Sequence, residues 1–415
     1  MNLVPHALLI FLVVITITGC FDNPAGESHE DTSRTTAIAP ESTITTTPQR
    51  IVAMAPQQDV EDKPSQRVLR FFPEFFPGGV EHSIPLNEIF HGGPLKDGIP
   101  ALTDPRTIPA SSADYLDNTD IVLGMTVNGE SRAYPLRIMN WHEIVNDTLG
   151  GRSILVTFCP LCGTGIAFDP VVDGKVAKFG VSGLLHNNDL LMYDRGTDTP
   201  SLWQQALGDA VVGPKTGTRL DLLPVTQAQW GEWKAAHPDT TALSTATGFN
   251  RDYNFNPYTG YELDPGLLFP LGGEEDGRLG RKTKVLGVRL GGTNKAYVLD
   301  ELRQTQVVND TVAGVPIVLI ASPNSDAVRV YERKNHQFER GFEKVVQVGT
   351  NRAWEITEES LSNPETGDSL ERIPEVFVSF WFAWASFYPD TLVYDGAFNV
   401  NPDARLFTTW GTIKR

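Results

Sequence analysis

Residues 122–148 read VLGMTVNGESRAYPLRIMNWHEIVNDT, and residues 285–311 read VLGVRLGGTNKAYVLDELRQTQVVNDT. The two stretches align without a gap at an offset of 163 residues. Further along the chain the offset falls to 151, where Trp230, Trp233 and Pro238-Asp239-Thr240 match Trp381, Trp384 and Pro389-Asp390-Thr391. Because a fixed period is the sequence signature of a repeated unit, we predict two tandem, diverged copies of one module, residues 110–250 and 275–400.

The local pattern of the first copy predicts a strand-rich α+β fold. Apolar runs flank Asn128-Gly129, a dipeptide typical of a two-residue hairpin turn. Short apolar runs at 154–158 and 165–168 are typical of buried strands. Apolar residues at helical spacing from Ile138 onward predict a helix that ends at Gly150-Gly151. The paired tryptophans predict a further helix in each copy.

The composition excludes several classes of partner. The chain has 415 residues, 51 of them acidic and 34 basic, which gives a formal net charge of −17. Nucleic acid is therefore not an expected partner, because phosphate binding needs clustered Lys and Arg. The sequence contains no glycine-rich phosphate loop, so we expect no nucleotide cofactor. The apolar fraction of 40% is sufficient for hydrophobic cores.

The N-terminus predicts export. An apolar run at residues 7–17 is too short to span a membrane and is followed by Thr18-Gly19-Cys20. This pattern resembles the lipobox of bacterial lipoproteins, which implies a signal peptide over 1–19 and a lipidated Cys20. No Lys or Arg precedes the run, and an ordinary signal peptide is the alternative. We expect a protein of the bacterial cell envelope held to the membrane by the Cys20 lipid, at the outer membrane or the periplasmic face in a Gram-negative source.

Two segments separate this signal from the first copy. Residues 20–66 are rich in Thr, Ser, Pro and acidic side chains, so they cannot bury enough apolar area to fold and predict a disordered tether. Residues 67–109 form a lead-in segment. Its stiff Pro- and Gly-rich part at 92–102 is expected to connect or to cover a site, with Asp97 supplying charge.

The differences between the copies locate the chemistry. Cys159-Pro160-Leu161-Cys162 of copy one aligns with Ser322-Pro323-Asn324-Ser325, and His142-Glu143 aligns with Thr305-Gln306. Copy two also lacks 12 residues, which removes most of 184–195, including His186. Residues needed only for the fold should persist in both copies. We therefore predict one functional site, in copy one.

The cysteine pair has the spacing of a metal knuckle. Two thiolates two residues apart can bind one ion from a tight turn, and a following glycine lets the backbone approach the sulfurs. The predicted ligands are Cys159, Cys162, His142 and His186, with Glu143, Asp194 and Met192 in reserve. Two thiolates with two imidazoles suit Zn²⁺, whereas thiolate with Met or His suits Cu(I).

Two alternatives stay open. Cys159 and Cys162 can serve a thiol–disulfide oxidoreductase, or they can form a structural disulfide in a non-catalytic envelope scaffold. The residues after Cys162 favour a strand over a helix, which is unlike a thioredoxin-type site. Catalytic residues stay unassigned, with Glu143 and Asp97 as candidates.

Five strings carry a resemblance to a known family: GGPLKDGIPAL, AYPLRIMNWHEIVNDT, VTFCPLCGTGIAFD, FGVSGLL and LLMYDR…SLWQQ. Together they resemble the prokaryotic family called domain of unknown function 3179, from about Phe90 to Pro389. The resemblance implies a hallmark around His142, Glu143, Cys159 and Cys162. Many relatives carry tyrosine where this chain has His186. The resemblance implies no substrate, so the metal or small-molecule partner stays unknown.

Overall fold

The computed structural model describes residues 62–396 except residue 343. The signal peptide, Cys20 and the tether up to residue 61 lie outside the described residues, as do positions 397–400 of the second copy. Helix α1 (Gln66–Phe71) begins at the last residue of the predicted tether, and Ser65 caps it by accepting a hydrogen bond from the Val68 amide. In the described part of the chain, no helix is both long and apolar enough to cross a membrane.

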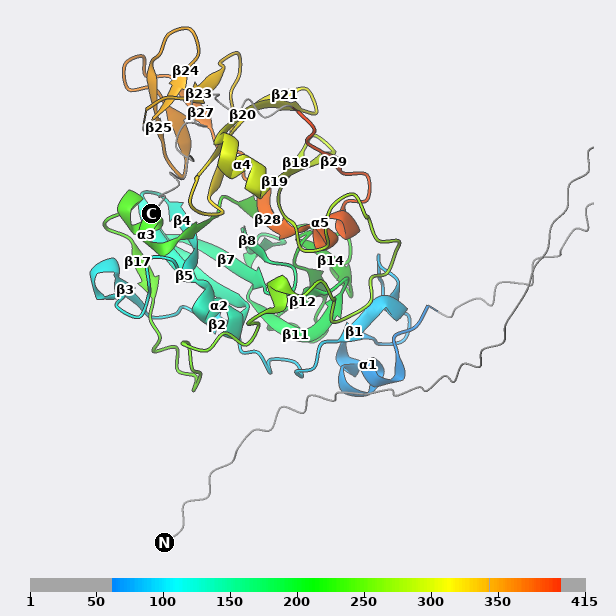
Figure 1. Cartoon of the computed structure of the whole chain (residues 1–415). Helices are drawn as coiled ribbons and strands as arrows, with labels where there is room; N and C mark the ends of the chain where they lie inside the picture. Colours follow the sequence, from blue (N-terminus) through cyan, green and yellow to red (C-terminus); the bar gives the residue numbers. More distant parts are fainter. Residues whose placement is uncertain (1–61, 343, 397–415) are drawn as a thin grey trace, which may run out of the picture. The chain divides into compact units, whose positions relative to one another are not determined.

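Strands dominate the architecture. No α-helix among the described residues is longer than seven residues, and the strand-rich α+β class predicted from sequence is confirmed (Figure 1). Two of these helices begin at Trp230 and Trp381, where the paired tryptophans predicted them. Besides α1, the described α-helices are α2 (Leu136–His142), α3 (Trp230–Ala236), α4 (Leu299–Thr305) and α5 (Trp381–Phe387), with 3-10 turns at Pro73–Phe75, Leu86–Glu88, Ala110–Ser112 and Tyr261–Leu263.

Three five-stranded sheets and one small hairpin belong to the first copy and its lead-in. The first sheet is, in order, β16 (Thr226–Gln229), β4 (Ile121–Val127), β5 (Glu130–Pro135), β17 (Thr241–Leu243) and β3 (Thr107–Pro109). The second is β15 (Leu222–Leu223), β8 (Thr164–Phe168), β7 (Arg152–Cys159), β6 (Ile144–Leu149) and β2 (Leu102–Thr103). The third is β1 (Ile89–His91), β11 (Phe179–His186), β12 (Asp189–Asp194), β13 (Leu202–Gln204) and β14 (Asp209–Val212). The hairpin pairs β9 (Val171–Val172) with β10 (Lys175–Val176).

The segment predicted as the second copy forms sheets of four, three and five strands. One sheet is β28 (Val376–Phe380), β18 (Lys284–Leu290), β19 (Thr293–Val298) and β29 (Leu392–Val393). Another is β20 (Val307–Val312), β21 (Val315–Ala321) and β22 (Val328–Glu332). The last, orange in Figure 1, is β23 (Phe338–Arg340), β24 (Val345–Gln347), β25 (Ala353–Ile356), β26 (Ser360–Ser362) and β27 (Ser369–Glu371). The parallel pairing of β17 with β5 recurs as that of β29 with β19.

Residues shared by the copies make the same contacts in both. The Asn146 side chain accepts from the Phe179 amide at 2.7 Å and donates to the Phe179 carbonyl at 2.9 Å. Asn309 does the same with Phe338, at 2.9 and 2.7 Å. The two asparagines therefore join β6 to β11 and β20 to β23, and each bond pair links one sheet to another. The Val-Asn-Asp-Thr string has a structural role in both copies, while their common origin stays a prediction.

One element boundary was predicted wrongly. The hairpin around Asn128-Gly129 and the two buried strands are confirmed. The helix from Leu136, however, ends at His142, and Glu143 has a left-handed φ of 58°. Strand β6 follows at once, because the β-branched Ile144 and Val145 favour extended backbone. Gly150-Gly151 forms the turn between β6 and β7.

The second copy packs directly on the cysteine turn of the first. Strand β28 contacts β8, and one hydrophobic cluster contains Cys159, Cys162, Phe380 and Trp381. Figure 1 shows β28 of the second copy beside β8 of the first. The cysteines therefore lie inside a core that both copies build.

Candidate functional site

The cysteines lie on a β-hairpin turn. Cys159 ends β7, Cys162 lies in the turn before β8, and Gly163 has a left-handed φ of 65°. The Phe380 amide donates to the Cys162 carbonyl at 2.8 Å, so the second copy fixes the turn. A Cβ at Gly163 would lie 3.2 Å from the Phe380 ring. Glycine is needed here both for its backbone conformation and for this close approach.

A second turn meets the first. Asn187 and Asn188 join β11 to β12 with φ values of 51° and 61°, which is typical of a type I′ hairpin. Asparagine tolerates this left-handed conformation. The Cys159 and Cys162 thiols donate to the Asn188 carbonyl, with sulfur-to-oxygen distances of 3.7 and 3.4 Å. The two turns together place the first residue of β12, Asp189, beside the sulfurs.

Asp189 completes a group of three candidate metal ligands. One of its carboxylate oxygens and the sulfurs of Cys159 and Cys162 all lie within 4.8 Å of one another. Its Oδ2 accepts from Gln204 Nε2 at 2.6 Å and from the Ala206 amide at 2.9 Å. Its Oδ1 is buried and accepts from no N–H or O–H group in the described part of the chain. Burial raises the pKa of Asp189 to about 6, against the opposing effect of these hydrogen bonds.

The two thiols are free and almost inaccessible to solvent. Cys159 is 1% exposed, Cys162 is 0% exposed, and no disulfide joins them. Burial raises the pKa of both thiols, and most strongly that of Cys162. Deprotonation in this position needs a compensating positive charge, which a metal ion supplies.

Glu143 is a buried acid next to this group. Its Oε1 accepts a hydrogen bond from the Tyr258 hydroxyl at 3.4 Å. Burial raises the pKa of Glu143 to about 8, and the nearby charge of Asp189 adds to the rise. Of the two predicted catalytic candidates, Glu143 is therefore the one close to the cysteines, and it is protonated at neutral pH.

His142 lies outside the group of three. Its Nδ1 donates to the Pro100 carbonyl at 2.7 Å, and its Nε2 lies 2.7 Å from the Tyr253 hydroxyl. Burial lowers the pKa of His142 to about 4, so the ring is neutral and its Nε2 lone pair accepts from the tyrosine. Neither ring nitrogen is free for a metal in this arrangement.

His186 is also outside the group but is linked to it. Its Nδ1 donates to Gln204 Oε1 at 2.8 Å, and the amide of the same Gln204 holds Asp189. Its Nε2 lies 3.5 Å from Glu88 Oε2. His186 therefore orients the residue that orients Asp189, a supporting role of the kind that metal sites use.

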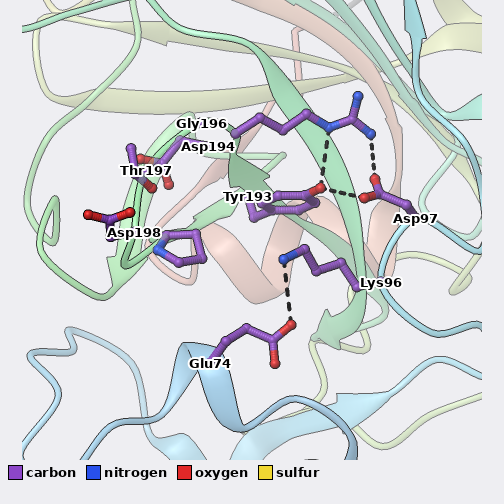
Figure 2. Close-up of a pocket in the computed structure, with 10 residues that line it drawn as sticks. Glu74, Lys96, Asp97, Tyr193, Asp194, Gly196, Thr197 and Asp198 are labelled. Carbon is purple, nitrogen blue, oxygen red and sulfur yellow. Dashed lines mark hydrogen bonds and ion pairs between the residues drawn. The ribbon is translucent and has the colours of Figure 1, made fainter.

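Asp97 lies in a different place, an open pocket of about 400 Å³ (Figure 2). Tyr193 donates to Asp97 Oδ2 at 2.5 Å, and Arg195 pairs with the other oxygen. Figure 2 shows Lys96 reaching toward Glu74 under the Tyr193 ring. Both carboxylate oxygens of Asp97 have partners in this pocket. The pocket lies at the opposite end of β12 from Asp189.

The reserve ligands are likewise placed elsewhere. Asp194 Oδ1 accepts from the Ser201 amide at 2.6 Å and so holds the loop that follows β12. Met192 is a fully buried core residue. Neither belongs to the group around the cysteines.

The linker between the copies, residues 251–274, covers the site. The Asn188 side chain accepts from the Phe269 amide at 2.9 Å and donates to the Phe269 carbonyl at 2.8 Å. Asn187 Oδ1 accepts from the Gly272 amide at 2.7 Å. The Asn187-Asn188 turn therefore contacts the thiols through its backbone carbonyl and binds the linker through its side chains.

Asp189 is the candidate ligand that the sequence analysis did not predict. It lies within the segment absent from copy two, three residues after His186. Confinement to copy one was therefore a signal that applied to Asp189 as well. Its position at the start of β12, set by the turn at Asn187-Asn188, is what brings it to the cysteines.

Comparison with known proteins gives one match. The sequence model of the family described as protein of unknown function (DUF3179) matches residues 96–391, more than two thirds of the chain. The match includes all the site residues from Asp97 to Gln204 and the linker. No curated protein and no solved structure matches the chain.

Proposed function

The chain belongs to the DUF3179 family of proteins of unknown function, and we propose that it binds one zinc ion between Cys159, Cys162 and Asp189. One observation carries the proposal: a carboxylate oxygen of buried Asp189 lies within 4.8 Å of two free thiols, and its Oδ1 accepts from no N–H or O–H group of the described residues. Thiols are weak donors, and a buried acceptor that is not satisfied costs about 1–3 kcal/mol. A cation bound by the carboxylate and the two sulfurs removes that cost.

The donor set selects the metal. Sulfur, sulfur and carboxylate oxygen are all ordinary zinc ligands, and zinc accepts them in one tetrahedral shell. Cu(I) prefers soft thiolate or thioether ligands. A hard carboxylate in third place therefore favours Zn²⁺ over Cu(I), the other metal expected from the sequence.

The surroundings also support metal binding over thiol–disulfide exchange. Catalytic exchange needs an accessible thiolate with a lowered pKa. Cys159 and Cys162 are buried, and burial raises the pKa of both. Gln204, which is held by His186, orients the carboxylate of Asp189. Support of a ligand by a hydrogen-bonded neighbour is typical of metal centres.

The location is part of the proposal. An exported chain anchored by a lipid on Cys20 would hold its metal in the cell envelope. Burial and metal binding would protect the two thiolates there from oxidation to a disulfide. Labelling of Cys20 by a fatty acid in a bacterial host, lost in Cys20→Ala, tests this part.

Metal analysis of the purified full-length protein tests the site. We expect about one equivalent of zinc, which is lost in Cys159→Ser/Cys162→Ser. Asp189→Asn should weaken zinc affinity by about tenfold or more. The matched control is Ser322→Ala/Ser325→Ala, which changes the two positions of copy two that align with the cysteines. It should retain the ion.

A histidine variant separates the structure-based ligand set from the sequence-based one. Because both nitrogens of His142 are engaged by Pro100 and Tyr253, His142→Gln should retain zinc at full stoichiometry. Full zinc content in the double cysteine variant, or no zinc in the unaltered protein, would overturn the proposal. Thiol–disulfide exchange between the zinc-free protein and a model disulfide would favour the oxidoreductase instead.

A further inference from the structure

A second buried polar atom near the cysteines has no partner. The hydroxyl of Tyr261 is buried and makes no hydrogen bond within the described residues. Burial and, after it, the charges of Cys162 and Cys159 raise the pKa of this hydroxyl. Tyr261 also packs against the hydrophobic cluster that contains both cysteines. The linker thus brings an unsatisfied hydroxyl to the metal site.

The tyrosine is held firmly in this position. It begins the 3-10 turn Tyr261–Leu263, and Lys282 lies over its ring at 3.3 Å from the centroid. The Lys282 ammonium also donates to the Tyr261 carbonyl at 2.5 Å. A cation over the ring and a bond to its backbone together fix the direction of the side chain.

The two unpartnered atoms require different partners. Asp189 Oδ1 is an acceptor, and a cation satisfies it. The Tyr261 hydroxyl carries a proton to donate, which no cation can accept. The two groups do not bond to each other. An additional molecule with a lone pair is therefore needed at this place.

The coordination number leads to the same requirement. The described residues offer the ion three protein ligands, whereas zinc takes four. Sites with three protein ligands keep an open position for an exogenous molecule, and closed structural sites use four. We infer that the zinc site of this protein is of the open kind, and that its fourth position takes a small exogenous ligand that accepts a hydrogen bond from Tyr261. This inference rests on the proposed zinc site.

The chemistry defines the class of that ligand. Two thiolates and one carboxylate leave a zinc centre with one net negative charge, so water is the resting ligand, and a small anion displaces it only with the help of a hydrogen-bond donor such as Tyr261. Azide is such an anion, with lone pairs that accept hydrogen bonds. The protonated carboxyl of Glu143 supplies a further proton nearby, and Tyr258 fixes its orientation. The competing fourth ligand is the Asn188 carbonyl, which lies against both sulfurs.

Cobalt substitution of the full-length protein tests the inference. Co²⁺ reports its coordination through visible absorption, and azide is the probe ligand. We expect azide to change the spectrum saturably, and Tyr261→Phe to weaken azide binding by about fivefold to tenfold, the effect of one lost hydrogen bond. Cobalt affinity itself should be unchanged. The control is Tyr297→Phe, which removes a buried tyrosine hydroxyl that donates to Asp310 in another hydrophobic cluster.

The outcomes distinguish the two levels of the proposal. Failure to bind cobalt or zinc would overturn the metal site itself. Stoichiometric cobalt with a spectrum insensitive to azide would leave the metal site standing and overturn the open position, in favour of Asn188 as fourth ligand. Equal azide affinity in Tyr261→Phe and the unaltered protein would overturn the role of Tyr261.

Discussion

The backbone carbonyl of Asn188 lies 3.4 Å from the sulfur of Cys162, although 26 residues separate them in sequence. This contact joins the tips of two β-hairpins. The Cys162 turn has a counterpart in copy two, between β21 and β22, whereas the Asn188 hairpin is reduced there to the short β23–β24 pair. The site is therefore made by an extension of one hairpin onto a turn that the module already has.

We expect the two hydrogen bonds from the Asn188 side chain to the linker to slow the release of the metal ion. Asn188→Gly keeps the left-handed turn, because glycine adopts φ values near 61° readily, but removes both bonds to Phe269. Two lost hydrogen bonds should make opening of the linker easier and speed zinc loss to a chelator by about tenfold or more. Stopped-flow chelator competition measures this rate.

The matched control is Asn128→Gly, which removes a turn asparagine with φ 50° at a distance from the linker. Its zinc-loss rate should equal that of the unaltered protein. Equal rates in all three proteins would show that metal exchange does not pass through the linker.

Because Gly163 lies against the second copy, we expect its substitution to lower both the stability of the protein and its affinity for zinc. Gly163→Ala forces alanine into a left-handed conformation and places its Cβ 3.2 Å from the Phe380 ring. We expect a loss of about 1–2 kcal/mol in the free energy of unfolding, and weaker zinc binding because the cysteine turn must shift. Gly174→Ala, with φ 72° and no neighbour within 4 Å, is the control for backbone strain alone. Unaltered zinc affinity in Gly163→Ala would argue against a supporting role for copy two.

Gly124 and Gly287 lie at equivalent positions in the two copies, so we expect their substitution to lower stability equally. A Cβ at Gly124 would lie 2.2 Å from the Trp233 ring, and one at Gly287 would lie 2.0 Å from the Trp384 ring. Alanine at either place should lower the free energy of unfolding by about 1–3 kcal/mol through overpacking. Gly78→Ala, with open space around it, should be neutral. Denaturant unfolding measures all three, and a neutral Gly287→Ala would show that copy two packs differently.

The fold class was predictable because it depends on local pattern. The Asn128-Gly129 turn, the buried strands and the paired tryptophans each carry a short-range signal that the structure follows. The end of α2 was not predictable from periodicity. The apolar spacing continues past His142, and only the left-handed Glu143 converts it from helix to strand. Sequence spacing does not encode that single backbone angle.

The site was predictable only in part, for a related reason. Adjacent cysteines in one turn are visible in the sequence, and the missing segment of copy two pointed to the right hairpin. Which residue of that hairpin reaches the sulfurs depends on its register. His186 and Asp189 pair directly across the turn and both bond to Gln204, but His186 lies against Glu88, whereas a carboxylate oxygen of Asp189 lies within 4.8 Å of both sulfurs. Histidine is the commoner ligand by type, but position decides in favour of aspartate.

The buried carboxyl of Glu143 determines a pH dependence of stability. Its pKa of about 8 in the folded protein lies above the ordinary 4.5 of the unfolded chain. Between these values the folded state keeps a proton that the unfolded state has released, so rising pH favours unfolding. Its contribution to stability is complete below pH 4.5 and is lost as pH rises to 8. The slope is about 1.4 kcal/mol per pH unit.

The interval from pH 6.5 to 8 covers most of the titration of this group. In the same interval unfolded His142 releases the rest of its proton from an ordinary pKa of 6.5, and folded Asp189 completes its titration from about 6, so the difference between the unaltered protein and Glu143→Gln isolates Glu143. In zinc-free, reduced protein we expect the free energy of unfolding to fall by about 2 kcal/mol across this interval, measured by urea unfolding. Glu143→Gln should flatten the profile, because glutamine has no proton to release, whereas Glu339→Gln, at an exposed carboxyl of copy two, should leave it unchanged. A profile that stays equally steep in Glu143→Gln would place the titrating group elsewhere and remove Glu143 as the proton-carrying acid beside the metal site.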